Sequence, residues 1–562
     1  QHTALLPDQP FFLYFAPGAT HAPHHVPLEW ANNYRGQFDD GWDALRERVF
    51  ARQKQIGVIP RDAVLTKRNE GIPAWNDMSD DIKPVLARQM EVFAGFLEYA
   101  DHHFGRLVDT IQTLGLLDNT LVLYLLGDNG ASAEGSLQGC FNELPVLVNG
   151  MPDLESPEFL ISKMEELGGP EAFNHFAVGW AHATSTPYQY TKQVASHWGG
   201  TRNGLVVRWP AGIQTKGEIR TQFHHVIDIA PTLLEVAGLP APTMVNSIQQ
   251  SPIEGTSMRY SFDDAAAQDR HETQYFEMVC NRGLYSKGWT AVTKHRAPWE
   301  NPPAPPVEED VWELYAPDDW TQAYDIAGEH PDKLLELQRG WLMEASRYNV
   351  MPLDDRFVER VNASLAGRPE IARGNSQFLF GGMGRLSESS VVSIKNKSHS
   401  VTAKVVVPGN RAAHGVIIAQ GGRFGGWSIY AYGGRLKYCY NYFGLEHYLV
   451  DSMKSVGPGE HEVRAEFAYD GDGIGKGGTV SLLIDADKVG EGRVERTVPV
   501  AFSLDETCDI GVDGGSPVSR DYAPRDNKFN GAIHWVHIDL QGDDHDREVP
   551  AEQRFRASMV WQ

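Results

Sequence analysis

The sequence predicts an α/β domain that is followed by an all-β sandwich. A helical pattern of apolar residues over residues 81–114 leads into an uncharged apolar run, Leu121–Leu126, and a helix followed by a buried strand is typical of α/β folds. From about Arg368 the helical periodicity disappears, and short alternating segments with glycine-rich turns indicate a sandwich of the jelly-roll type. We therefore expect the α/β domain over residues 1–365 and the sandwich over residues 370–562.

The composition is that of a globular protein with an acidic surface. The 562 residues are 41% hydrophobic and 22% charged, and the formal net charge is −24. This charge argues against nucleic acid as a partner, because phosphate binding needs a basic surface. The apolar runs are too short to span a bilayer, so we expect no membrane segment. An anionic substrate must then be attracted by local cationic side chains or by a metal ion.

The cysteines and the start of the chain leave the compartment open. The four cysteines lie too far apart for metal-ligand or redox spacing and are too few for a disulfide scaffold: Cys140, Cys280, Cys439 and Cys508. The chain begins at Gln1 and opens almost directly on an apolar run. We expect that its natural N-terminus lies upstream, so that cytoplasmic and periplasmic or secreted locations both stay open.

The first elements are a strand and a histidine-bearing loop. The apolar run Phe11–Phe15 predicts a buried strand, and the prolines and glycine after it exclude a helix. His21 comes first after the strand, where an imidazole can donate to an oxyanion or a leaving group. For His24 and His25 we favour solvated side chains or hydrogen bonds to nearby backbone.

Helices then lead to the central strand. Residues 28–54 are expected to be helical with loops, and residues 81–114 form the clearest amphipathic helix, which Gly115 ends. The run Leu121–Leu126 has no charge and is closed by glycine, which predicts a fully buried, parallel strand.

The turn Gly127-Asp128-Asn129-Gly130 follows this strand. It would place a carboxylate and an amide oxygen at the carboxyl edge of a sheet, where α/β folds bind ligands. Such oxygens suit a hard cation such as Ca²⁺ or Mg²⁺. The alternative is a plain strand-to-turn junction, since Asp-Asn-Gly is favourable turn chemistry.

The next region carries further candidate cations. Residues 131–189 are polar and glycine-rich and predict a surface insertion over a site, with one helix over residues 156–167. Lys192, His197 and Arg202 then fall within eleven positions and are potential anion ligands. The alternatives are solvated cations and, for Arg202, a structural ion pair. A Gly-Gly turn and the strand Leu205–Trp209 follow.

The rest of the first domain predicts a helix over Ile227–Ala237, a small antiparallel sheet within about residues 255–350, and a helix over residues 331–348. In the sandwich, Gly433-Gly434 between two strands indicates a hairpin. Asp470, Asp472 and exposed aromatic residues there could bind a cation or a sugar, but we favour turn residues and strand packing.

Several of these stretches, in this order, resemble a type I sulfatase of the arylsulfatase family, within the alkaline-phosphatase-like superfamily. The resemblance covers roughly residues 1–350 and implies an α/β core with a smaller C-terminal antiparallel subdomain. The matching stretches are Phe11–Pro27, Ala31–Trp42, Leu121–Gly130, Lys192–Arg202, His225–Gly238 with Glu254-Gly-Thr-Ser257, and Trp312–Ala327.

The resemblance also implies roles for individual residues. Asp128 and Asn129 match the second pair of Ca²⁺ ligands in the family. His21 and Lys192 match catalytic residues that contact the sulfate ester near its leaving oxygen, and cationic donors with a divalent metal would stabilise the charge that grows there. His197 stands in a His-Trp-Gly-Gly sequence that departs from the Glu-Gly-Gly commoner in the family. We predict that it contacts the substrate. The partner would be a small-molecule or glycan sulfate ester.

The family's nucleophile is a formylglycine made within a Cys/Ser-x-Pro/Ala-x-Arg motif near the N-terminus, and no cysteine here has that context. The upstream Asp-Asp metal ligands are also absent. We therefore expect the chain to be the C-terminal portion of a sulfatase and inactive in isolation. Two alternatives stay open: a phosphonate or phosphate-ester hydrolase of the same superfamily, and a non-catalytic fragment with a glycan-binding sandwich. The oligomeric state is not predicted.

Overall fold

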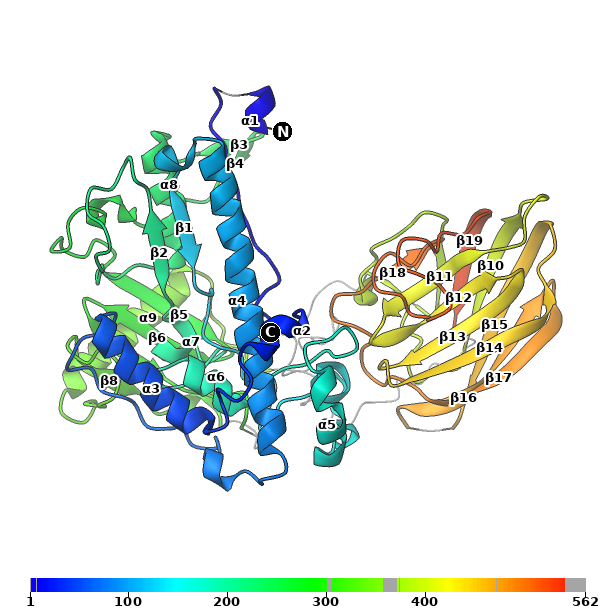
Figure 1. Cartoon of the computed structure of the whole chain (residues 1–562), viewed down its shortest axis with the longest axis horizontal. Helices are drawn as coiled ribbons and strands as arrows, with labels where there is room; N and C mark the ends of the chain where they lie inside the picture. Colours follow the sequence, from blue (N-terminus) through cyan, green and yellow to red (C-terminus); the bar gives the residue numbers. More distant parts are fainter. Residues whose placement is uncertain are drawn as a thin grey trace.

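The computed structural model describes residues 2–6, 8–300, 305–356, 371–372, 374–471 and 473–540. Figure 1 shows two bodies side by side, one built of helices and small sheets and the other a β-sandwich, with α5 on the side of the first body that faces the sandwich. The helices are α1 (His2–Leu5), α2 (Leu28–Asn32), α3 (Gly41–Ile56), α4 (Lys83–Thr113), α5 (Pro157–Lys163), α6 (Val178–Thr184), α7 (Trp198–Thr201), α8 (Ile229–Ala237) and α9 (Pro331–Arg347).

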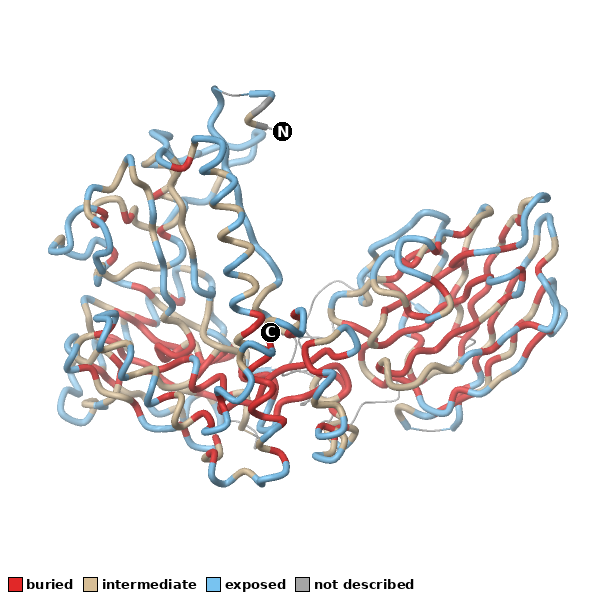
Figure 2. Tube along the Cα trace, viewed as in Figure 1, coloured by how far each residue is buried: buried red, intermediate tan, exposed pale blue. Residues whose placement is uncertain are grey.

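The helices predicted from 3.6-residue periodicity are confirmed as α4, α8 and α9. The first half of α4 is buried and the second half is largely exposed, as the change from red to tan and pale blue along it shows (Figure 2). Among the described helices, none combines the length and the apolar character that a bilayer crossing needs.

The central strand differs from its prediction. β1 (Val122–Leu125) pairs antiparallel with β2 (Leu205–Arg208), and this ribbon has no third strand among the described residues. Tyr124 stacks on Phe104 of α4 at 4.4 Å between ring centroids, yet most of the strand is only partly buried. The prediction of a fully buried, parallel strand is therefore wrong. An apolar run records which side chains avoid water, but it does not record the direction of the neighbouring strand.

The segment Phe11–Phe15 also differs, because it forms no strand and its side chains are exposed, Phe12 by 76% and Tyr14 by 82%. No strand of the described residues is hydrogen-bonded to it. An extended apolar segment becomes a buried strand only where neighbouring strands satisfy its backbone and cover its side chains.

Residues 131–189 are core rather than a surface insertion. Trp180 of α6 is fully buried against Trp42 of α3 and Trp75, and its indole N–H donates to the carbonyl of Leu86 at 2.8 Å. Gly179 lets this packing form, since a Cβ there would lie 2.3 Å from the Trp42 ring. The prediction failed because glycine served close packing here and not a loop.

The predicted small antiparallel sheet is confirmed. Its four strands lie in the order β5 (Thr273–Met278), β6 (Asn281–Ser286), β7 (Trp289–Thr293) and β8 (Glu313–Tyr315). Leu337, Trp341 and Ala345 of α9 share a buried apolar cluster with this sheet. A two-stranded ribbon, β3 (Met244–Val245) with β4 (Ile248–Gln249), completes the first body.

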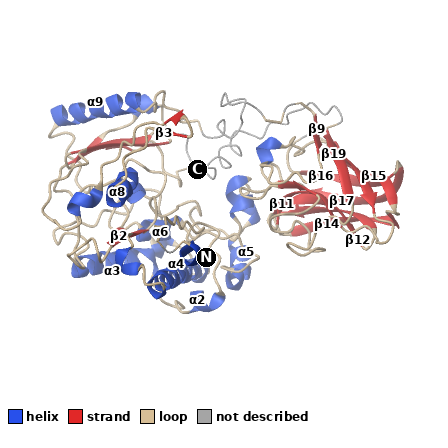
Figure 3. Ribbon diagram, turned by 90° about the horizontal axis from the view of Figure 1, so that it is seen from above, coloured by secondary structure: helices blue, strands red, loops and turns tan. Residues whose placement is uncertain are grey.

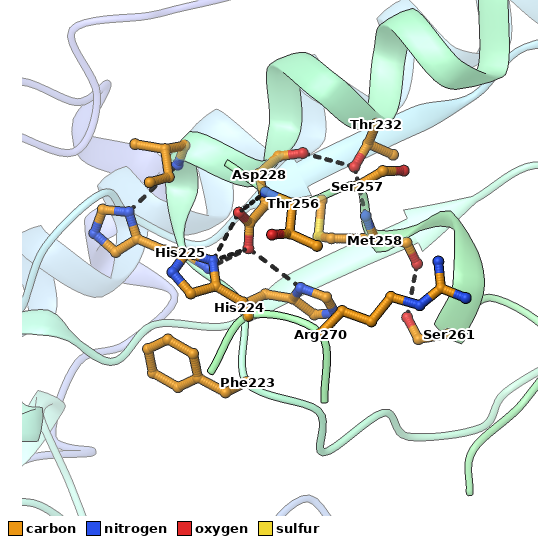
Figure 4. A network of polar contacts seen from close by, with 12 residues as sticks. Phe223, His224, His225, Asp228, Thr232, Thr256, Ser257, Met258, Ser261 and Arg270 are labelled. Carbon is orange, nitrogen blue, oxygen red and sulfur yellow. Dashed lines mark hydrogen bonds and ion pairs between the residues drawn. The ribbon is translucent and has the colours of Figure 1, made fainter. Parts of the chain in front are cut away.

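Asp228 ties α8 to the chain around it (Figure 4). Its buried carboxylate accepts hydrogen bonds from the side chains of His271 at 2.8 Å and His224 at 3.3 Å, and from the backbone N–H groups of His225 at 2.9 Å and Thr256 at 2.7 Å. Burial alone would raise the pKa of Asp228, but these four donors lower it well below its usual range. One carboxylate thus joins the start of α8 to two loops.

The sandwich consists of two antiparallel sheets, with strand orders β17-β16-β15-β10-β19-β9 and β14-β13-β12-β11-β18 (Figure 3). Gly433 and Gly434 form the predicted hairpin turn with φ of 58° and 82°. The strands are β9 (Ser376–Leu379), β10 (His399–Val407), β11 (Gly415–Gly422), β12 (Gly425–Tyr432), β13 (Arg435–Tyr442), β14 (Glu446–Ser455), β15 (Gly459–Tyr469), β16 (Lys476–Ile484), β17 (Asp487–Arg496), β18 (Cys508–Ile510) and β19 (Ala532–Asp539).

Two predicted features lie wholly or partly outside the described residues. These are the domain boundary near residues 365–375 and Asp472.

One segment of the first body contributes side chains to the buried core of the sandwich. Leu144 and Val148, in a single π-helical turn (Leu144–Val148), belong to the same buried apolar cluster as the sandwich core. Asn149 adds hydrogen bonds, because its amide donates to the carbonyl of Ala501 at 3.0 Å and its side-chain oxygen accepts from the N–H of Val500 at 2.9 Å. We name residues 140–155 the bridging segment.

Leu144→Ala should lower the free energy of unfolding by about 2–5 kcal/mol, because truncation of a fully buried leucine leaves a cavity at a site that cannot collapse. Chemical denaturation followed by circular dichroism measures this loss. Leu137→Ala is the matched control, since Leu137 is 40% exposed, and it should change the value by less than about 0.5 kcal/mol. Equal denaturation midpoints for both variants would mean that Leu144 does not stabilise the contact with the sandwich.

Candidate functional site

Two loops that carry predicted site residues lie against each other through their backbones. The N–H of Gly130 donates to the carbonyl of Gly200 at 3.0 Å, and the N–H of Lys192 donates to the carbonyl of Ala131 at 3.0 Å. A Cβ at Gly130 would lie 1.8 Å from the carbonyl oxygen of Gly199, so only glycine permits this approach. The Asp128-Asn129 turn is therefore held beside the loop that presents Lys192.

Lys192 meets His21 at this point. The Lys192 Nζ lies 3.1 Å from Nε2 of His21, and Nδ1 of the same ring lies 2.9 Å from the carbonyl of Ala22. A carbonyl can only accept, so Nδ1 carries the proton and Nε2 accepts from the lysine ammonium. His21 is exposed, whereas the Lys192 side chain is 13% exposed. The structure thus brings together the two residues predicted to contact the ester.

Glu134 is a partner that sequence reasoning missed. Its Oε2 lies 3.0 Å from the Lys192 Nζ and accepts from the Ser132 hydroxyl at 2.6 Å, while Oε1 accepts from the Gln193 amide at 2.8 Å. The Glu134 side chain is only 7% exposed. No sequence pattern marks it, because one carboxylate in a glycine-rich segment is ordinarily a solvated loop residue.

Two buried histidines lie behind this ion pair. His175 places Nε2 at 2.9 Å from the Ser132 hydroxyl and Nδ1 at 3.0 Å from the carbonyl of Phe176. Burial lowers the pKa of His175 to about 4, and it lowers the pKa of the neighbouring His24 as well. Both rings are therefore neutral near pH 7. His24 is packed in the core and is not a solvated loop residue, which corrects the prediction for it.

Asp128 and Asn129 remain accessible at the end of β1. Asp128 is exposed, and the Asn129 amide donates to its Oδ1 at 2.9 Å. A carboxylate and an amide oxygen fit a hard cation, but Ca²⁺ takes 6–8 oxygen ligands. Within the described part of the chain, no cluster of three or more His, Cys, Asp or Glu side chains could hold a metal. The two residues fit part of a cation site.

His197 and Arg202 both contact other residues of the fold. His197 is fully buried, with Nε2 at 3.0 Å from Oε2 of Glu313 and Nδ1 at 2.8 Å from the Ser196 hydroxyl. These contacts hold the His197 ring in place, and its contact with a substrate stays a prediction. Arg202 stacks on the ring of Trp320 at 3.6 Å, which is a cation–π contact and not the ion pair we had considered.

Comparisons with known proteins agree with the resemblance. Residues 3–239 match the sequence model of the sulfatase family. An uncharacterized sulfatase of Schizosaccharomyces pombe is 31% identical over 355 residues, which cover 62% of this chain and 60% of that protein. An arylsulfatase of Klebsiella aerogenes is 28% identical over 254 residues, which cover 45% of this chain and 51% of that protein. The chain thus spans between half and two thirds of the length of these relatives.

Among solved structures, a putative sulfatase from Bacteroides fragilis aligns with a TM-score of 0.32 and 13% identity, over 58% of this chain and 51% of that one. The family match covers the part of the chain that holds His21, Asp128 and Lys192. Over residues 3–239 the chain is therefore similar to proteins of the sulfatase family.

Proposed function

We propose that this domain hydrolyses a sulfate monoester of a small molecule or a glycan, with the help of a divalent cation, Ca²⁺ rather than Mg²⁺. The observation that carries the proposal is the contact between Lys192 and His21 at 3.1 Å, beside the Asp128-Asn129 turn. A buried ammonium next to an exposed imidazole is suited to an anionic group whose leaving oxygen gains charge.

The two side chains would act on the leaving alcohol. As the S–O bond breaks, negative charge develops on the leaving oxygen, and the Lys192 ammonium stabilises it. His21 is held by Ala22 and lies within proton-transfer distance of Lys192, so the pair can deliver a proton to that oxygen. Asp128 and Asn129 would hold the cation, which would neutralise charge on the sulfate.

The attacking group in this proposal is a formylglycine. All four cysteines are buried, and none lies in the required motif. Ser364-Leu365-Ala366-Gly367-Arg368 fits the Ser-x-Ala-x-Arg pattern, although it lies outside the described residues and beyond the family match. Mass spectrometry of the active protein tests whether Ser364 is oxidised to formylglycine. An oxidised Ser364 places the nucleophile here, and an unmodified Ser364 places it elsewhere.

The product of the complete gene should release 4-nitrocatechol from its sulfate ester and should prefer this ester to a matched phosphate or phosphonate ester. Chelation with EGTA should abolish the activity, and Ca²⁺ should restore it. A preference for the phosphonate would favour the related phosphonate hydrolases. Hydrolysis of none of these esters, together with glycan binding by the sandwich, would favour a non-catalytic role.

Asp128→Ala should abolish hydrolysis of 4-nitrocatechol sulfate and Ca²⁺ binding, because it removes the charged oxygen ligand. Isothermal titration calorimetry measures the binding without relying on activity. Asp118→Ala is the matched control, since Asp118 is an exposed aspartate shortly before β1, and it should leave both properties unchanged. Retained Ca²⁺ binding in the Asp128 variant would place the metal elsewhere.

A further inference from the structure

We propose that Glu134 is a positioning residue that fixes the Lys192 ammonium against His21 and leaves one ammonium hydrogen for the ester. The proposal rests on the sulfatase function proposed above. It assigns a role to a buried carboxylate that the sequence did not mark. Glu134 does not itself touch the substrate, because its two oxygens already face Lys192, Ser132 and Gln193.

The geometry fixes the lysine at both ends. At its backbone, Lys192 donates to the carbonyl of Ala131, and at its tip Nζ lies 3.0 Å from Glu134 and 3.1 Å from His21. An ammonium has three hydrogens, and two of them serve these acceptors. The third is the one we assign to the ester oxygen. A long flexible side chain is thereby held in one position before substrate arrives.

The carboxylate is held as firmly as the lysine. Gly135, the next residue, packs so closely on the chain that a Cβ there would lie 1.9 Å from the carbonyl oxygen of Phe176 and 2.8 Å from Nδ1 of His175. On its other side the carboxylate receives the Ser132 hydroxyl, which also lies beside His175. The orientation of Glu134 is thus set by backbone packing and by hydrogen bonds.

Burial makes this ion pair strong. The side chains of Glu134 and Lys192 are 7% and 13% exposed, so water screens their charges little. His24 and His175 lie close by but are neutral, so Glu134 supplies the counter-charge on the buried side of Lys192. A buried charge that loses its partner is costly, and the lysine would then lose its proton or turn toward solvent.

Glu134→Gln should lower kcat for 4-nitrocatechol sulfate by about 10- to 100-fold with little change in KM, because a residue that orients a catalytic group typically contributes this much. Glu134→Asp keeps the charge and should recover part of the loss. The matched control is Glu388→Gln, which breaks a partly buried pair with Lys395 in the sandwich and should leave kcat and KM unchanged.

A second readout is independent of catalysis. At a fixed pH, trinitrobenzenesulfonate should label Lys192 at least about tenfold faster in the Glu134→Gln variant than in the wild type, because the amine has lost its counter-charge. Peptide mass spectrometry quantifies the labelling. Unchanged labelling, or an unchanged kcat in a folded variant, would overturn the role of Glu134. Absent hydrolysis by the product of the complete gene would refute the sulfatase proposal alone, since labelling still tests the ion pair.

Discussion

Lys192→Ala should lower kcat/KM for a sulfate ester by about 10²- to 10³-fold, the effect of removing one preorganised donor from a developing negative charge. The loss should lie mainly in kcat, because the ammonium is matched to charge that exists only in the transition state. His21 remains in the variant and supports residual activity. Steady-state kinetics with 4-nitrocatechol sulfate measure both parameters.

The variant also leaves Glu134 buried without a cation, so a stability control is needed. The double variant Lys192→Ala with Glu134→Gln removes both charges and should recover thermal stability without recovering activity. Lys395→Ala is the matched control, because Lys395 forms a comparable lysine–glutamate pair with Glu388 far from the site. A kcat/KM for Lys192→Ala within threefold of the wild type would show that the lysine does not serve the reaction.

Asp228→Ala should lower the free energy of unfolding by about 3–5 kcal/mol, which is typical when one partner of a buried charged network is removed. The change leaves four donors without an acceptor, at His224, His225, Thr256 and His271. Asp264→Ala is the control, since Asp264 is exposed and caps a single turn. Its effect should stay below about 0.5 kcal/mol.

The stabilising effect of Asp228 should depend on pH in two windows. The pKa of Asp228 is lowered by folding, so its contribution is present above the unfolded value of about 3.9 and is lost as the pH falls through the folded value. Burial would lower the pKa of His271, but Asp228 raises it above the usual value, so that part is present below about pH 6.5 and is lost as the pH rises through the folded value. The difference in stability between wild type and Asp228→Ala should therefore be largest near pH 5–6.5. A difference that does not vary with pH would contradict the role of these ionised groups.

Periodicity predicted the elements whose burial follows one face. The apolar pattern of α4 and α9 and the alternation in the sandwich strands predicted these elements correctly, because such patterns depend on local sequence. The direction of β1 was not predictable, since it depends on β2, which is about 80 residues away. The buried role of residues 131–189 was hidden because glycines there permit close packing, as Gly179 does against the ring of Trp42.

The candidate site was predicted only in part, because its residues come from segments that lie far apart in the sequence. His21 and Lys192 lie in loops between elements, where catalytic residues are commonly found, and the fold brings their side chains together. The partners of Lys192 and His197 were not predicted. The carboxylate that no pattern marked binds the lysine, and the histidine that a motif marked is buried against Glu313. The spacing of these residues in the sequence predicts neither the Glu134–Lys192 pair nor the His197–Glu313 pair.

The bridging segment has a consequence for how the chain can be divided. Glu134 lies six residues before this segment, and the segment itself completes the apolar core of the sandwich through Leu144 and Val148. An excised N-terminal half would carry those side chains in water, and an excised sandwich would lack part of its own interior. The two bodies therefore share one apolar core, and neither is expected to keep its full stability when it is cut from the other.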